Sequence, residues 1–153
     1  MNRKAFLLAE ETLKIIIALI AISFLIYFLT SLYFANVNSQ KKQQAEASLT
    51  RILDVIKNIR TEVENVTDIT PVSWHLFSFV GDDKKPNACS GENCLCICYN
   101  VKINLFDRKI KECDKKGICE IVENLEDIDE IKIRRAPFVL EIEKTDKIII
   151  REK

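Results

Sequence analysis

The sequence predicts an α+β protein in which an N-terminal transmembrane helix continues into a long amphipathic helix, packed on a small antiparallel β-rich head that cysteines staple together. Three observations predict this fold. Residues 15–34 form an unbroken apolar run, residues 39–66 place apolar side chains at steps of three and four, and residues 71–153 alternate short β-prone segments with turns. All six cysteines fall in the third region.

The apolar run from Ile15 to Phe34 has 20 residues and contains neither a charge nor a proline. At about 1.5 Å per residue it spans about 30 Å, which matches the hydrocarbon core of a bilayer. A cleaved secretory signal would have a shorter apolar region ending in small residues. Here Tyr33 and Phe34 stand at the end, and such aromatic residues are typical of interfacial anchors. We therefore expect a helix that is retained in the lipid bilayer.

The residues before the run resemble the start of type IV prepilins, the precursors of pilin-like proteins. Arg3-Lys4-Ala5 matches the end of the basic leader, and Phe6 and Glu10 follow at the family's spacing. The resemblance covers about 30 residues and implies cleavage after Ala5, with Phe6 as the new N-terminus. It also implies that Glu10 neutralises the terminal amine of a neighbouring subunit, since a carboxylate buried in lipid needs a partner charge. The composition, rich in Lys, Ile and Glu, also resembles small membrane proteins of archaea, which implies no function.

An uncleaved anchor is the alternative interpretation of residues 1–14. Glu11 and Lys14 add charges where the pilin family is usually apolar, and Lys14 follows Glu10 at the favourable i,i+4 spacing. Glu10 would then have a partner within its own helix. In that case residues 1–14 form a basic leader and a polar collar at the membrane surface.

The charges around the span predict its orientation. Arg3, Lys4 and Lys14 precede it, so the N-terminus is expected in the cytoplasm and residues 35–153 outside. Asn65 begins an Asn-Val-Thr glycosylation sequon, which has meaning only on an exported segment. The cysteine cluster agrees with an extracytoplasmic head.

Residues 35–70 are expected to form an amphipathic helical stalk that ends at residues 68–71. The apolar residues of its stripe are Ala45, Leu49, Ile52, Leu53, Ile56, Ile59, Val63 and Val66. This stripe must be covered either by the head or by a partner helix, and we expect the head to cover it.

Residues 71–153 are expected to form the head. The strands predicted there are 73–80, 94–106, 110–113, 118–122, 131–135, 138–143 and 148–152, the last two joined as a hairpin.

The six cysteines, namely Cys89, Cys94, Cys96, Cys98, Cys113 and Cys119, predict three disulfides. If residues 94–98 are extended, Cys94, Cys96 and Cys98 share one face with parallel Cβ vectors and Cα atoms roughly 6.6 Å apart at each step. They should therefore not pair with one another. Each must then pair with one of the other three, which reduces the fifteen pairings that six cysteines allow to six.

A zinc site is the alternative for the cysteines, with ligands drawn from Cys94, Cys96, Cys98, Cys113 and Cys119. The extended C-x-C-x-C spacing lacks the turn of a familiar zinc knuckle, and this absence favours disulfides over a zinc site. Reduced or redox-active thiols are the third alternative. His75, the single histidine, is expected to be a strand surface residue rather than a ligand.

Several function classes are disfavoured by the composition. The 23 basic and 23 acidic residues form no basic patch, which argues against nucleic-acid binding. The sequence holds no Gly-x-Ser-x-Gly, phosphate-binding loop or His-Glu-x-x-His motif, so we expect no catalytic residue, no cofactor and no small-molecule substrate. The expected function is that of a pilin-like structural subunit, a homo-oligomer assembled through its N-terminal helix. The alternative is a monomeric membrane-anchored binding domain with a structural zinc and no filament.

Overall fold

The computed structural model describes residues 3–60, 62–81, 84–99, 106–128, 130–135 and 137–153, with side chains described from Glu11 onward and, in the second helix, from Ile110 onward. The chain forms two compact units, Met1–Ser39 and Gln40–Lys153. Helix α1 (Arg3–Asn58) makes up the described part of the first unit and begins the second. The expected α+β class is confirmed, because the structure has a long apolar N-terminal helix, antiparallel sheets and three disulfides.

The first unit is helical and apolar. Helix α1 includes a segment long and apolar enough to cross a membrane, and the side chains of that segment are exposed. The hydroxyls of Ser23 and Thr30 donate to the backbone carbonyls of Leu19 and Ile26, at 2.8 and 3.0 Å. These hydroxyls are therefore satisfied within the helix itself.

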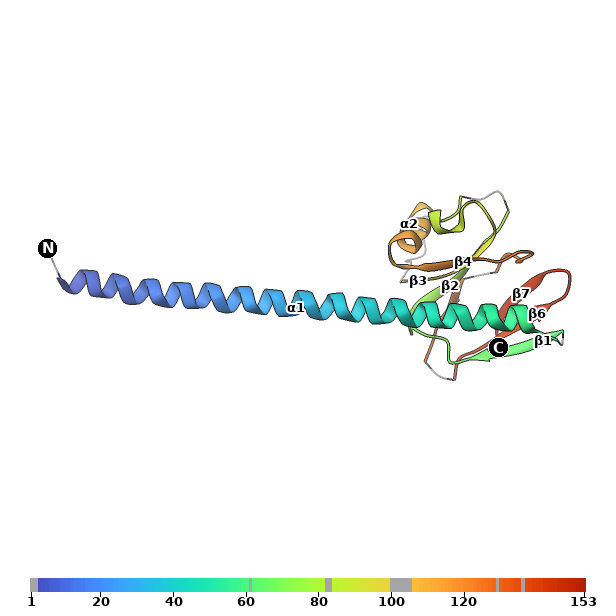
Figure 1. The fold of residues 1–153 in the computed structure, drawn as a ribbon, viewed down its shortest axis with the longest axis horizontal. Helices are drawn as coiled ribbons and strands as arrows, with labels where there is room; N and C mark the ends of the chain where they lie inside the picture. The colour runs from blue at the N-terminus through green and yellow to red at the C-terminus, as the bar shows by residue number, and fades with distance from the viewer. Residues whose placement is uncertain (1–2, 61, 82–83, 100–105, 129, 136) are drawn as a thin grey trace. The chain divides into compact units, whose positions relative to one another are not determined.

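The second unit contains two antiparallel sheets (Figure 1). The three-stranded sheet has the order β1 (Val63–Thr67), β6 (Val139–Lys144), β7 (Ile148–Glu152). The four-stranded sheet has the order β4 (Ile118–Ile121), β3 (Cys94–Tyr99), β2 (Trp74–Phe79), β5 (Ile131–Lys132). A 3₁₀ turn, η1 (Asn87–Cys89), and helix α2 (Phe106–Lys116) complete the unit. The expected hairpin is confirmed as β6 and β7, with Lys144 opposite Ile148.

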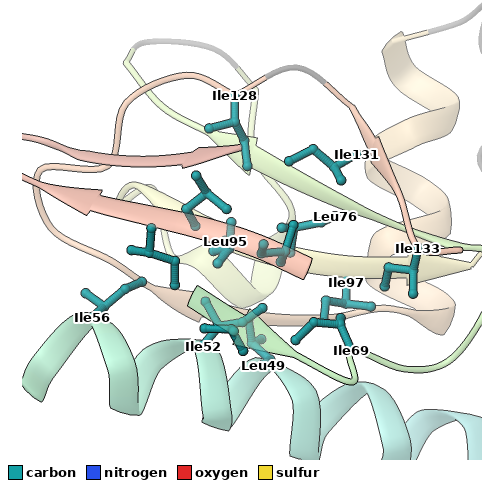
Figure 2. Close-up of a cluster of buried hydrophobic side chains, with 14 of the residues drawn as sticks. Leu49, Ile52, Ile56, Ile69, Leu76, Leu95, Ile97, Ile128, Ile131 and Ile133 are labelled. Carbon is teal, nitrogen blue, oxygen red and sulfur yellow. The ribbon is translucent and has the colours of Figure 1, made fainter. Parts of the chain in front are cut away.

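One apolar core joins the C-terminal part of α1 to both sheets (Figure 2). Leu49 and Ile52 are fully buried, and Ile56 is 6% exposed. They belong to the same cluster as Leu76 and Leu95 of the four-stranded sheet. The steps of three and four along residues 45–56 therefore place one helix face against the sheets.

The two central strands of the four-stranded sheet, β2 and β3, are buried on both of their faces. On β3, Leu95 and Ile97 belong to the apolar core, whereas Cys94, Cys96 and Cys98 belong to a second buried cluster on the opposite face. This is the alternation that an extended strand imposes, and it is the alternation expected for residues 94–98.

The predicted extent of the amphipathic helix, residues 35–70, was wrong. Helix α1 ends at Asn58 rather than at residues 68–71, and residues 63–67 form β1 at the edge of the three-stranded sheet. Val66 is buried there, but Val63 is 44% exposed and does not extend the apolar stripe. The amino group of Lys144 donates to the carbonyl of Ile56 at 2.8 Å, which satisfies one of the free acceptors at the helix end.

The predicted strand 110–113 was also wrong, because these residues lie in α2. Ile110 and Cys113 are one helical turn apart and join the second buried cluster together. A short apolar pattern is compatible with either a strand or a helix, and here tertiary packing favours the helix. The predicted strand 94–106 ends at Tyr99 in the structure, and its residues 100–105 lie outside the described residues. The strand expected at 131–135 is reduced to the two residues of β5.

Candidate functional site

The most distinctive chemical feature of the second unit is the layer of cysteines on one face of β3. The disulfides join Cys89 to Cys94, Cys96 to Cys119, and Cys98 to Cys113. Each cysteine of β3 is therefore paired with a cysteine outside the strand, which is one of the six pairings that the sequence allowed.

Three different elements supply the outside cysteines. Cys119 lies on β4 directly opposite Cys96, with their Cα atoms 4.1 Å apart. Cys113 comes from α2, with its Cα atom 5.0 Å from that of Cys98, and Cys89 ends η1. The bridges thus fasten η1, β4 and α2 to a single strand. Loops of these lengths correspond to roughly 2–4 kcal/mol of stabilisation for each bridge.

Aromatic side chains of β2 cover the same layer. Phe79 pairs with Cys94 and Phe77 with Cys96 in the β2–β3 register, and both rings are almost fully buried. Cys94 and Cys96 are themselves fully buried. The sulfur atoms therefore lie in a dry, apolar environment.

Gly117 explains how α2 can approach the strand so closely. A Cβ atom at Gly117 would lie 2.6 Å from the carbonyl oxygen of Cys113 and 2.9 Å from the sulfur of Cys98. The absence of a side chain therefore allows the Cys98–Cys113 bridge to form beside the helix end. Sequence reasoning missed this role, although a glycine directly after Lys115 and Lys116 is a typical signal of a helix C-terminus.

His75 is buried, so the prediction of a surface residue was wrong. The residue is 6% exposed and lies opposite Cys98 in the β2–β3 register. Its Nε2 atom lies 3.4 Å from a carboxylate oxygen of Glu130, and its Nδ1 atom has no hydrogen-bond partner among the described residues. Burial lowers the pKa of His75 below 6.5; Glu130 opposes this shift and Lys132 adds to it. The folded chain therefore favours the neutral imidazole.

The expected alternative zinc ligands are all engaged in disulfides. Cys94, Cys96, Cys98, Cys113 and Cys119 each share a sulfur–sulfur bond, so in this oxidised form they offer no thiolate to a metal. Zinc binds cysteine as the thiolate. The structure does bring the sulfur atoms of Cys89, Cys96 and Cys119 within 4.8 Å of one another.

A hollow of about 400 Å³ lies between β7 and the segment that leads into β5. Its lining includes the charged residues Glu126, Asp127, Arg151 and Glu152. These charges already have partners within the chain. The ion pairs are Lys147–Glu126, Arg151–Glu143 and Arg134–Glu152, and the hydroxyl of Ser78 donates to Asp127 at 2.9 Å.

The remaining predicted site residues lie far from the cysteine layer in sequence. Ala5, Phe6 and Glu10 fall in α1, and their side chains are outside the described set. Asn65 is exposed on β1, where its amide oxygen accepts a hydrogen bond from Lys153 at 3.3 Å. Their processing, assembly and glycosylation roles stay predictions.

No protein-family model, curated protein or solved structure matches the chain.

We predict that Gly117→Ala destabilises the second unit by about 1–3 kcal/mol, because the added methyl group collides with backbone atoms of Cys113 and with a disulfide sulfur. The measurement is urea unfolding of the full chain in detergent, followed by the fluorescence of Trp74, the single tryptophan, which is 3% exposed. Lys115→Ala, at an exposed position of the same helix end, is the control. Equal stability of Gly117→Ala and the control would show that the close approach is unimportant.

We also predict a pH dependence that originates at His75. Its pKa is lower in the folded chain than the 6.5 of the unfolded chain, so its contribution to stability is complete above pH 6.5 and is lost as the pH falls through the folded pKa. The free energy of unfolding of the wild type should therefore fall more steeply between about pH 7.5 and 5.5 than that of His75→Gln. Carboxylates that do not interact with residue 75 contribute equally in both proteins and cancel in this comparison. Identical slopes would refute the assignment.

Proposed function

We propose that the protein is a non-enzymatic, single-span membrane protein that serves as a pilin-like structural subunit. In this proposal its N-terminus faces the cytoplasm and its disulfide-braced head lies outside the membrane. The observation that carries the proposal is the uncharged run of residues 15–34 in α1, whose large apolar side chains are exposed around the helix.

The exposure of this run is not confined to one face. Ile15, Ile16 and Ile17 point about 100° apart around the helix axis, given about 3.6 residues per turn. They are nevertheless exposed by 60, 53 and 58%. A helix that is apolar on every side needs lipid or other apolar helices around it. A bilayer, or a bundle of copies of the same helix, meets that need.

The disulfides support an extracytoplasmic head. Structural disulfides persist in oxidising compartments and are rare in the cytosol. The three bridges join cysteines of one layer, five of them buried and Cys119 partly buried, and the sequon residue Asn65 is exposed on β1. The basic residues before the span agree with a cytoplasmic N-terminus.

The proposed assembly role rests on the prepilin-like residues. Cleavage after Ala5 would create an amine on Phe6, and Glu10 of an adjacent copy would neutralise it within the apolar bundle. Lys14 offers the same carboxylate a partner in its own helix at the i,i+4 position. Whether the N-terminus is cleaved and whether copies associate therefore distinguishes a pilin-like subunit from a simple membrane anchor.

We predict that Glu10→Leu weakens association between copies at least about tenfold, equivalent to about 1.4 kcal/mol, because it leaves the neighbouring amine without a partner. Two differently tagged copies are expressed together, extracted in mild detergent and co-isolated. Intact mass reports whether residues 1–5 have been removed. Glu11→Leu removes an adjacent carboxylate that points about 100° away, and it is the matched control.

The expected result is a processed wild type whose copies co-isolate, a Glu11→Leu variant that resembles it, and a Glu10→Leu variant that does not. The fluorescence of Trp74 should be unchanged in all three, since the substitutions lie outside the second unit. A retained N-terminus, or co-isolation that is insensitive to Glu10→Leu, would contradict the subunit role.

A further inference from the structure

Two of the three disulfides lie side by side in the cysteine layer. The sulfur atoms of Cys94 and Cys96, which belong to different bridges, are 3.9 Å apart. The sulfur atoms of Cys89, Cys96 and Cys119 lie within 4.8 Å of one another. Four sulfur atoms from η1, β3 and β4 therefore form one compact group.

One separation in this group has the length found between the ligands of a tetrahedral metal ion. A zinc–sulfur bond of about 2.3 Å places the sulfur atoms of a tetrathiolate site about 3.8 Å apart. The Cys94–Cys96 separation of 3.9 Å already has this value. To reach it, the two sulfurs within each bridge must move apart from bonding distance, while the sulfurs of Cys89, Cys96 and Cys119 start within 4.8 Å of one another.

We propose that Cys89, Cys94, Cys96 and Cys119 form a redox-dependent metal site, which holds two disulfides when oxidised and one tetrahedral zinc ion when reduced. This ligand set differs from the zinc alternative considered from the sequence, since it includes Cys89 and excludes Cys98 and Cys113. The proposal is independent of the pilin-like function, because it concerns only the chemistry of the second unit.

The redox change is balanced with a dithiol as the reductant. Two dithiol molecules each transfer two electrons to one protein disulfide, so that both sulfur–sulfur bonds break and two oxidised, cyclic disulfides are released. The four protein thiols then bind one Zn²⁺ ion and release four protons. The reverse exchange uses two molecules of a small disulfide as the oxidant: each accepts two electrons and two protons, both protein bridges re-form and Zn²⁺ is released.

The surroundings of the group favour this chemistry. Cys89, Cys94 and Cys96 are fully buried beside Phe77 and Phe79, which exclude water from the bound ion. Cys119 is only partly buried and gives an external thiol a point of attack. Thiolate ligands also select zinc over hard cations such as Ca²⁺ and Mg²⁺.

The bridge between Cys98 and Cys113 has a separate role in the proposal. It fastens α2 to β3 and supplies no ligand, although full reduction opens it as well. A variant that lacks these two cysteines must therefore retain the metal site. This provides a matched control with the same number of cysteines removed as in a variant that lacks two ligands.

The test uses the full chain in detergent, reduced with a phosphine that is then removed without air, and titrated with Co²⁺ as a spectroscopic substitute for Zn²⁺. The wild type should bind one Co²⁺ with the strong charge-transfer and visible bands of a tetrahedral tetrathiolate. The double variant Cys98→Ser/Cys113→Ser should give the same spectrum. The double variant Cys89→Ser/Cys119→Ser should bind at least about tenfold more weakly and lose the tetrathiolate bands.

A second readout does not depend on the variants. Zn²⁺ should protect four of the six cysteines of the reduced wild type from alkylation and leave two reactive, which intact mass counts directly. The proposal is overturned if the reduced wild type gives no tetrathiolate spectrum, if removal of Cys98 and Cys113 abolishes it, or if the Cys89→Ser/Cys119→Ser variant binds like the wild type.

Discussion

The burial of strand β3 on both faces is the constraint on which the second unit depends. Its leucine and isoleucine side chains enter the apolar core between α1 and the sheets, while its cysteines enter the opposite layer. A strand separates its two faces with a period of two residues, so one short segment serves both clusters. A shift of register by one residue would exchange the two faces and lose both.

The arrangement of the outer layer follows from that constraint. Cysteines two residues apart on an extended strand have parallel side chains and cannot bridge one another, so their partners must come from other elements. In the structure η1, β4 and α2 each supply one partner, and the strand becomes the common attachment point of three peripheral segments. The absence of a side chain at Gly117 lets the last of these segments come close enough.

The features that were predictable from sequence are those set by the residue spacing at which the side chains of a helix or a strand repeat. The apolar run, the helix face at Leu49 and Ile52, the cysteine face of β3 and the β6–β7 hairpin all repeat at the spacing of their element. The end of α1, the helical state of residues 110–113 and the burial of His75 depend on contacts between segments distant in sequence. No local spacing encodes such contacts. The prepilin-like start stays a prediction, since its function lies in contacts between chains.

The central claim is that three disulfides bond β3 to η1, β4 and α2, and the number of free thiols tests it most directly. The chain is isolated from its membrane without reductant, unfolded in the presence of an alkylating reagent and weighed before and after reduction. A head braced by three disulfides takes up no label before reduction and six labels after it. Labels taken up before reduction would contradict the account, because at least one of the three bridges that hold η1, β4 and α2 to β3 would then be absent.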